Sequence, residues 1–186
     1  LLFFTNHAQE YKSRASEFAD TKASVLGDYV ASKLEMEEGE VPLFMTVTVD
    51  YRGYMLFFYQ NGKCAKIPLA SYMTKQNRRK LLKAYSDKEE LAAMLHIEEE
   101  TELAVFTSGG TGGPRLILVG SALIPEKATR DTAGINMVTL KKNARIAKVR
   151  PAAGLELKDP HRYRVRTLPA AGALLRQEDT TEQMSL

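Results

Sequence analysis

The sequence predicts an all-β protein of about three propeller-like blades of antiparallel strands, and two observations carry this prediction. An apolar, strand-like run recurs at a period of about 50 residues, with copies that begin at Leu1, Tyr54 and Arg115. Each copy ends in a charged tail, at residues 34–41, 95–103 and 140–146. Such repetition is typical of arrays in which one unit cannot bury its own apolar face and stacks on its neighbours. We therefore assign residues 1–150 to blades at roughly 1–49, 50–107 and 108–150.

Apolar and β-branched runs predict the individual strands within these blades. The first strand is expected at 1–5, and the run 41–51 is rich in β-branched residues. Asn61-Gly62 is the strongest short hairpin signal, so residues 54–59 and 64–69 are expected to pair across it. Their positions in the repeat predict further strands at 29–34, 101–107, 116–119, 121–124, 136–140 and 146–149.

Residues 80–95 contain many good helix formers, yet the repeat favours a strand for their second half. Residues 88–95 occupy the place that 29–34 occupies in the first blade, and tertiary context often overrides intrinsic propensity. After Pro151 the pattern fades into stretches that contain Pro and Gly, followed by a polar end. We therefore expect 151–186 to be a C-terminal extension that is partly disordered.

The composition is that of an ordinary globular protein, with 44% hydrophobic and 26% charged residues. No apolar run approaches the ~20 residues that a membrane span requires, so no membrane partner is expected. The single cysteine, Cys64, excludes an internal disulfide and fits a reducing cytoplasm. Because the chain begins with Leu1 inside an apolar run, we expect it to be a segment of a longer protein.

Residues suited to catalysis or metal binding are few and scattered. His7, His96 and His161 have no ligand spacing, and Cys64 lies inside a predicted strand with no second ligand nearby. The loop 108–114 has four glycines, but Pro114-Arg115 stands where a phosphate-binding loop requires a lysine and a helix. The carboxylates at 37–38 and 98–100 occupy equivalent tails, so we interpret them as structural. The sequence thus predicts no catalytic residue and no metal site.

Basic residues are unevenly distributed along the chain, whose net charge is +3. Between Lys141 and Arg166 there are nine basic residues and only two acidic ones, Glu156 and Asp159. A second basic cluster lies at 75–83. If the blades stack, such clusters can align into a stripe that attracts the phosphates of duplex DNA without reading its bases.

Two segments carry family-like motifs. Leu2-Phe3-Phe4-Thr5-Asn6 form the motif L-F-F-T-N, and residues 129–142 are similar to the motif T-R-T-T-Q-G-V-x-V-M-T-L-K-K. Together with the hairpin 53–69, they resemble the C-terminal domain of the A subunit of bacterial type IIA DNA topoisomerases, meaning DNA gyrase and topoisomerase IV. The resemblance covers most of residues 1–150 and none of 151–186. The glycine-containing basic box that gyrase uses for tight DNA wrapping is absent, and only residues 76–80 echo it.

The resemblance implies a β-pinwheel, a ring of four-stranded blades that binds or bends duplex DNA on a basic outer rim. It implies a non-catalytic part of an isomerase that controls supercoiling by ATP-dependent strand passage in the bacterial cytoplasm, at the nucleoid. The expected partners are double-stranded DNA, the remainder of the A subunit and the B subunit. ATP and Mg²⁺ would act in other domains, so no cofactor is expected in this segment. Hairpin placement and charge give the candidate DNA-binding residues Lys63, Lys66, Arg78, Arg79, Lys80, Arg130, Lys141, Lys142, Arg145, Lys148 and Arg150.

The alternative interpretation is a propeller-like module that binds a protein partner through its acidic tails and does not bind DNA. Reversal of the charges of Lys141, Lys142 and Arg145 separates the two interpretations, because it should abolish DNA binding only under the first.

Overall fold

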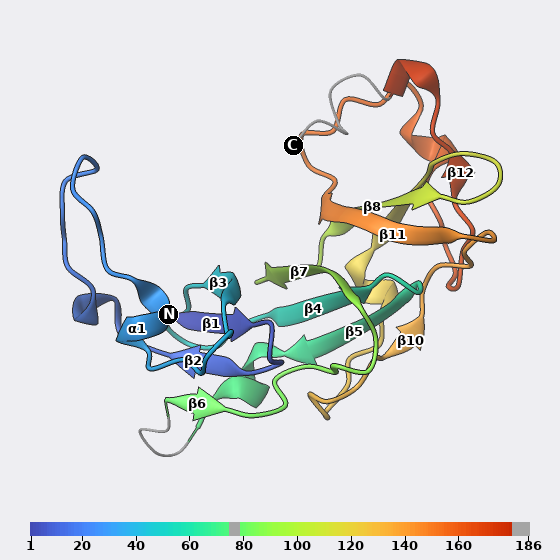
Figure 1. Cartoon of the computed structure of the whole chain (residues 1–186). Coiled ribbons are helices and arrows are strands. Elements are labelled where there is room, and N and C mark those ends of the chain that lie inside the picture. Colours follow the sequence, from blue (N-terminus) through green and yellow to red (C-terminus); the bar gives the residue numbers. More distant parts are fainter. Residues whose placement is uncertain (75–78, 180–186) are drawn as a thin grey trace.

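Three four-stranded antiparallel sheets, which we name A, B and C, make up the computed structural model (Figure 1), which describes residues 1–74 and 79–179. Figure 1 shows β4 and β5 of sheet B in the middle of the molecule, with sheet A on one side and sheet C on the other. The described residues also include one short helix, α1 (Val30–Lys33), and several 3-10 turns.

The strands of each sheet follow one order. Sheet A has the order β3-β1-β2-β6, sheet B the order β10-β5-β4-β7, and sheet C the order β11-β8-β9-β12. Sheet A comprises β1 (Leu2–Thr5), β2 (Glu10–Lys12), β3 (Pro42–Thr46) and β6 (Lys80–Leu81). Sheet B comprises β4 (Tyr54–Tyr59), β5 (Lys63–Pro68), β7 (Leu91–Ile97) and β10 (Ile135–Asn136). Sheet C comprises β8 (Glu102–Gly109), β9 (Arg115–Gly120), β11 (Ala144–Pro151) and β12 (Ala173–Leu174).

Each sheet consists of a hairpin, a third strand beside the first hairpin strand, and a short fourth strand from further along the chain. The chain that leaves the hairpin of sheet B supplies β6 to sheet A, and the chain that leaves the hairpin of sheet C supplies β10 to sheet B. The C-terminal extension supplies β12 to sheet C. We call β6, β10 and β12 the exchange strands, because they tie each sheet to a later part of the chain.

A bulge recurs at one place in all three sheets and confirms that they are structural repeats. The pairing register shifts between Phe4 and Thr5 in sheet A and between Phe58 and Tyr59 in sheet B. In sheet C the shift lies between Ile146 and Lys148 of β11, which pair with Thr107 and Phe106 of β8. A bulge bends a strand and increases its twist, so its recurrence gives the three blades one curvature.

Sheet B is buried on both faces, which explains its unbroken apolar run. Met55, Phe57 and Tyr59 of β4 face sheet A, while Leu56 and Phe58 face sheet C. Strand residues alternate between faces, so a strand sandwiched between two sheets must be apolar at every position. The same alternation in β8 sends Leu103 and Val105 toward sheet B, and Ala104 and Phe106 to the outer face of sheet C.

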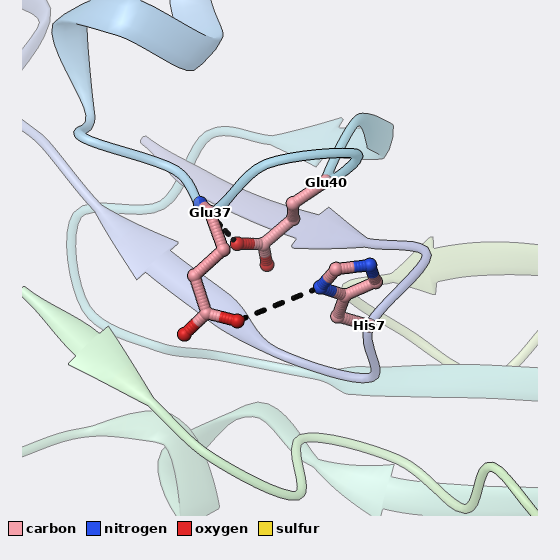
Figure 2. Close-up of side chains that lie close together, drawn as sticks. All are labelled: His7, Glu37 and Glu40. Carbon is pink, nitrogen blue, oxygen red and sulfur yellow. Dashed lines mark hydrogen bonds and ion pairs between the residues drawn. The ribbon is translucent and has the colours of Figure 1, made fainter.

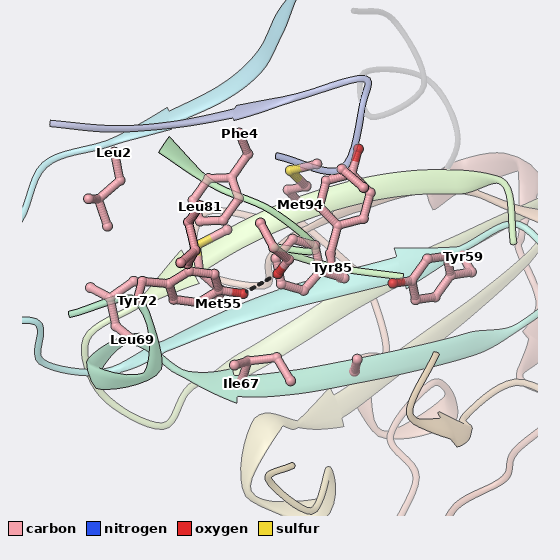
Figure 3. Close-up of a cluster of buried hydrophobic side chains, with 14 residues drawn as sticks. Leu2, Phe4, Met55, Tyr59, Ile67, Leu69, Tyr72, Leu81, Tyr85 and Met94 are labelled. Carbon is pink, nitrogen blue, oxygen red and sulfur yellow. Dashed lines mark hydrogen bonds between the residues drawn. The ribbon is translucent and has the colours of Figure 1, made fainter. Parts of the chain in front are cut away.

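Aromatic side chains fill the interface between sheets A and B (Figure 3). The Phe4 ring meets the Tyr72 ring edge-on with centroids 5.2 Å apart, and the Phe57 ring edge-on at 5.8 Å. The Tyr72 hydroxyl donates to the Ala84 carbonyl at 2.7 Å, and the Tyr85 hydroxyl donates to the Thr5 carbonyl at 2.6 Å. Buried aromatic rings contribute through both area and edge-to-face contact, so this interface is a main source of stability.

The structure confirms most of the predicted strands. Strands occur at 2–5, 42–46, 54–59 and 63–68, and the Asn61-Gly62 turn closes its hairpin with Gly62 at φ 90°. The repeat-based prediction for 88–95 is also confirmed, because β7 covers Leu91–Ile97 despite its helix-forming composition. About three blades were predicted, and three sheets are present within the described residues.

Two predicted strands are wrong, and the strand predicted at 136–140 is much shorter, because β10 ends at Asn136. Residues 29–34 contain helix α1, and residues 121–124 contain a 3-10 turn at Ser121–Leu123. Leu34 packs on Phe3 and Tyr11, so the first segment covers the face of sheet A and adds no strand to its edge. The Ser121 hydroxyl accepts from the Thr101 amide and donates to Glu100, so the second segment turns at the end of β9 and does not continue as a strand. The blade ranges also cannot coincide with the sheets, because β6 and β10 belong to the preceding sheet and β8 begins at Glu102.

The C-terminal extension contributes to the structure as far as residue 179. It supplies β12, and Tyr163 packs with Ala104 and Phe106 on the outer face of sheet C. The predicted disorder of its end falls on residues 180–186, which lie outside the described residues. In the described parts of the chain, no helix has the length and apolar character needed to cross a membrane.

Candidate nucleic-acid interface

Three of the candidate DNA-binding residues lie on one face of β11. Arg145, Lys148 and Arg150 pair across the sheet with Ser108, Phe106 and Ala104 of β8. Residues opposite each other in a sheet share a face, and Phe106 and Ala104 lie on the outer face of sheet C. Ile146 and Val149 point the other way, into the core shared with sheet B. The bulge and the alternation of β11 thus bring three basic side chains to the side that sheet B does not cover.

Lys141 and Lys142 lie in the turn that leads into β11, and the glycine loop makes room for this turn. Asn143 has φ 62°, and the Ala144 amide donates to the Lys141 carbonyl at 2.9 Å. Gly110, at φ 76°, lies so close that a Cβ there would be 2.8 Å from the Lys142 carbonyl oxygen. The sequence predicted a loop at 108–114, and its glycines allow the basic turn to close onto the β8–β9 hairpin.

The basic residues of this part of sheet C have few carboxylates to neutralise them. Lys141, Lys142 and Arg145 are exposed, and Arg150 is half-buried. None of these four forms an ion pair with a carboxylate of residues 1–74 or 79–179. We define these four residues, together with Lys148, as the β11 basic surface. The charges of Lys141, Lys142, Arg145 and Arg150 are available to an external anion.

A second group of candidates surrounds a surface hollow beside β6. Arg79, Lys80 and Arg130 line this hollow together with Glu37, Leu81 and Leu82. Arg79 pairs with Glu17 at 3.2 Å, and Lys80 pairs with Glu37. The hydrogen bond between Lys80 and Glu37 raises the pKa of the Lys80 ammonium and lowers the pKa of the Glu37 carboxyl. The structure therefore gathers three predicted residues in one place, but carboxylates already neutralise two of them.

Arg130 mainly holds the chain together in this hollow. Its Nη1 donates to the Ser71 carbonyl at 2.8 Å, and its guanidinium lies 5.9 Å from the centre of the Tyr72 ring. These contacts tie the segment before β10 to the turn after β5.

Lys63 and Lys66 are less accessible than predicted. Lys63 pairs with Glu89 at 2.9 Å. Lys66 is only 3% exposed, pairs with Glu100 and lies 4.2 Å from the centre of the Tyr54 ring. A phosphate cannot reach an ammonium that the fold encloses, so we exclude Lys66 from the interface. Arg78 lies outside the described residues.

Two exposed arginines were not among the candidates, although they belong to the same basic run. Arg162 and Arg166 are exposed on the segment that hydrogen-bonds to Leu118 of β9, through the Tyr163 carbonyl and the Val165 amide. Arg164, between them, pairs with Glu102 at 2.7 Å. Because β9 lies on the far side of β8 from β11, these residues add positive charge at the opposite edge of sheet C. The excess of basic residues between 141 and 166 was the signal that could have identified them.

His7, Glu37 and Glu40 come together at one edge of sheet A, and they are the one group in the described residues that could offer three ligands to a cation (Figure 2). The His7 Nδ1 lies 3.7 Å from a Glu37 oxygen. Glu40 already accepts hydrogen bonds from the Thr5 and Tyr11 hydroxyls and from the Glu37 amide. Burial alone would raise the pKa of Glu40, but these hydrogen bonds outweigh it and leave the pKa low. Glu37 in turn holds the Lys80 ammonium, so we assign the group a structural role.

Cys64 is enclosed in the core between sheets B and C, and it is 1% exposed. Burial raises the pKa of its thiol far above the usual value, so the thiolate needed for nucleophilic attack does not form near neutral pH.

Comparison with known proteins places this architecture in a known class. No protein-family model matches the sequence, and no curated protein matches it. The solved C-terminal domain of DNA topoisomerase IV has a TM-score of 0.74 and 18% identity, over 93% of this chain and 57% of that one. The C-terminal domain of DNA gyrase A has a TM-score of 0.65 and 13% identity, over 92% of this chain and 58% of that one. The E. coli ParC C-terminal domain has a TM-score of 0.65 and 12% identity, over 95% of this chain and 76% of that one.

The chain therefore has a β-pinwheel fold, as the sequence resemblance implied. Solved structures that share this fold include the C-terminal domains of DNA topoisomerase IV and DNA gyrase A. The chain spans little more than half the length of the first two.

Proposed function

We propose that this chain is a DNA-binding C-terminal region of the A subunit of a type IIA DNA topoisomerase. The observation that carries the proposal is the β11 basic surface, where Lys141, Lys142, Arg145 and Arg150 have no described carboxylate partner. Duplex DNA is a regular array of negative charge, and basic side chains that neutralise its phosphates release counterions. The fold shared with topoisomerase domains supports the same proposal.

In this role the chain binds or bends duplex DNA and performs no chemistry. Strand passage, ATP hydrolysis and Mg²⁺ binding belong to the remainder of the A subunit and to the B subunit, in the cytoplasm of a bacterium and at its nucleoid. Contact through phosphates alone gives little sequence preference. The surface is therefore suited to holding any DNA segment near an enzyme that changes DNA topology.

The test is a titration of labelled duplex DNA with the full chain at several salt concentrations, read by fluorescence anisotropy. The logarithm of the association constant should fall linearly with the logarithm of salt concentration, with a slope of about −0.9 for each phosphate contacted. Two duplexes of unrelated sequence should bind equally well. Absence of binding at low salt would refute the proposal and would favour the alternative, a protein-interaction module without DNA binding.

A further inference from the structure

Strand β2 places an acid and a base on the face of sheet A that packs against sheet B. Glu10 pairs with Phe4 and Lys12 pairs with Leu2, and both of these apolar partners belong to the core between the two sheets. Residues two apart in a strand share a face, so Glu10 and Lys12 point into the same interface. The equivalent residues are Cys64 and Lys66 in sheet B and Leu116 and Leu118 in sheet C. Among the three sheets, sheet A alone has a carboxyl group at this place.

The two equivalent lysines bind the same kind of carbonyl but differ in their other partners. The Lys12 ammonium donates to the Tyr72 carbonyl, in the 3-10 turn that follows the hairpin of sheet B. The Lys66 ammonium donates to the Ser121 carbonyl at 3.3 Å, in the 3-10 turn that follows the hairpin of sheet C. Lys66 also pairs with the Glu100 carboxylate, whereas Lys12 donates to uncharged oxygens. Each lysine thus fastens its sheet to the next one, and Lys12 does so without a carboxylate.

Glu10 is an acid whose carboxyl group has no partner. It is fully buried, and neither Oε1 nor Oε2 has a hydrogen-bond partner among residues 1–74 and 79–179. An ionised carboxylate in such a place loses its hydration and gains nothing in return, whereas the neutral acid loses much less. Burial accordingly raises the pKa of Glu10 to about 7. The arrangement in the structure therefore suits the neutral acid, and the acid loses its proton near neutral pH.

Charged and titratable groups from several elements surround Glu10. They are Lys12 on β2, the Leu1 amino group, Arg130 before β10, Tyr51 before β4 and Tyr72 after β5. Arg130 has a donor that is not in use, because its Nη1 donates to the Ser71 carbonyl at 2.8 Å while its buried Nε has no partner in the described residues. An ionised Glu10 therefore has two cations that can donate to it, the guanidinium of Arg130 and the ammonium of Lys12.

We propose that Glu10 is a pH-sensitive switch for the contact between sheets A and B. While Glu10 is protonated, the Lys12 ammonium binds the Tyr72 carbonyl, as in this structure. When Glu10 releases its proton to solvent, the carboxylate accepts from the Arg130 Nε and draws the Lys12 ammonium away from Tyr72. The Tyr72 hydroxyl also donates to the Ala84 carbonyl, just beyond β6, at 2.7 Å. Release of the Tyr72 carbonyl therefore weakens the attachment of this exchange strand as the pH rises.

An NMR titration of the full, isotope-labelled chain tests this switch without DNA, because the switch does not depend on DNA binding. The pH is varied between about 5 and 9, which brackets the pKa of Glu10. Three signals should shift together with one midpoint near pH 7, namely the carboxyl carbon of Glu10, the carbonyl carbon of Tyr72 and the Nε–H group of Arg130.

The equivalent turn of sheet C provides a matched control within the same molecule. The carbonyl carbon of Ser121 accepts from Lys66, but the residue that corresponds to Glu10 is Cys64, which has no carboxyl group. Burial would raise the pKa of Glu100, but its bonds to Lys66 and Ser121 outweigh this and leave the pKa low. Glu100 therefore stays ionised across the titration, and the Ser121 carbonyl should not shift.

Two variants assign the cause of the shifts. Glu10→Gln is neutral at every pH and should abolish the shifts of Tyr72 and Arg130. Lys12→Met should abolish the shift of Tyr72 and raise the midpoint of Glu10, because one opposing cation is lost. A Tyr72 carbonyl that stays fixed while Glu10 titrates, or a Glu10 that does not titrate in this range, would overturn the proposal. Shifts that persist in Glu10→Gln would also overturn it, because another group, such as an imidazole, would then be their cause. These outcomes need only the native chain and Glu10→Gln, so they stand even if Lys12→Met does not fold.

Discussion

Sheets A and C share one plan of strands and one bulge, yet they differ in how their charges are compensated. Residues 1–50 contain nine acidic and four basic side chains, whereas residues 141–166 contain two acidic and nine basic ones. The basic residues that belong to or border sheet A, such as Lys80 and Arg79, pair with Glu37 and Glu17. In the β11 basic surface, Lys141, Lys142, Arg145 and Arg150 form no ion pair with a carboxylate of the described residues. The repeat sets the shape of each blade, and the charges added to that shape decide which blade can attract an anion.

The two sheets also differ in the residue at one buried position. Glu10 pairs with Leu81 of β6, as Leu116 pairs with Ala173 of β12. Leu116 is apolar, whereas Glu10 is 0% exposed and its carboxylate accepts no hydrogen bond from the described residues. Burial raises the pKa of Glu10 to about 7, although Lys12 and Arg130 oppose the rise. Sheet A therefore contains a buried acid at a position where sheet C has a leucine.

The largest expected effect compares equivalent positions of sheets C and A, of which one faces sheet B and the other is open to solvent. Val149→Glu would bury a charge between sheets B and C, and it should lower the free energy of unfolding by at least about 3 kcal/mol. Met45→Glu, at the equivalent position of sheet A, should change it by less than about 0.5 kcal/mol, because this side chain is half exposed. Urea denaturation of both variants measures the difference. Equal losses would mean that the outer face of sheet A is already covered.

The next prediction concerns the buried acid. A raised pKa means that Glu10 favours the folded state at low pH, and that this contribution is lost as the pH rises through about 7. Between about pH 4 and pH 8 the native chain should lose about 3 kcal/mol of its free energy of unfolding through Glu10, and Glu10→Gln should remove this loss. Denaturation curves across this range provide the measurement, with Glu38→Gln as an exposed control. Parallel pH profiles for the native chain and Glu10→Gln would contradict the assignment.

A smaller effect is expected on DNA binding. The double variant Lys141→Glu and Lys142→Glu should weaken DNA binding by about tenfold or more and reduce the steepness of the salt dependence by about two units. The double variant Arg14→Glu and Lys88→Glu carries the same change of net charge on exposed residues outside the β11 basic surface. It should have a much weaker effect in the same anisotropy titration. If both variants weaken binding equally, only the net charge of the chain matters.

The smallest effect should come from releasing the paired bases of sheet A. Glu17→Gln with Glu37→Gln frees Arg79 and Lys80, and exposed ion pairs contribute only about 0.2–1 kcal/mol each. DNA affinity should therefore rise by only about two- to fivefold. The same change at Glu35 and Glu38, which also removes two charges, provides the control. Equal gains from both pairs of substitutions would show that pairing does not limit the hollow beside β6.

Local sequence patterns predicted the hairpin at Asn61-Gly62 and most strands correctly, but they did not predict β2, the second strand of the first hairpin. Asn61-Gly62, the apolar run 54–59 and the recurring tails report on short-range geometry, which the chain encodes within a few residues. Even the strand at 91–97 followed from the repeat, where propensity alone favoured a helix. The motifs at 2–6 and 129–142 indicated the topoisomerase-like fold that comparison with solved structures confirms.

Only the tertiary structure decided which sheet receives each exchange strand and which basic residues are already compensated. β6, β10 and β12 are two residues long and pair with hairpins far away in the sequence, so no local period marks them. Lys66 and Lys141 are the same type of residue, and both lie in basic stretches. Lys66 is enclosed against Glu100 and Tyr54, and Lys141 is exposed on a turn. That difference depends on residues brought together from distant parts of the chain. Composition determined the sign of the charge, and long-range packing determined where that charge is accessible.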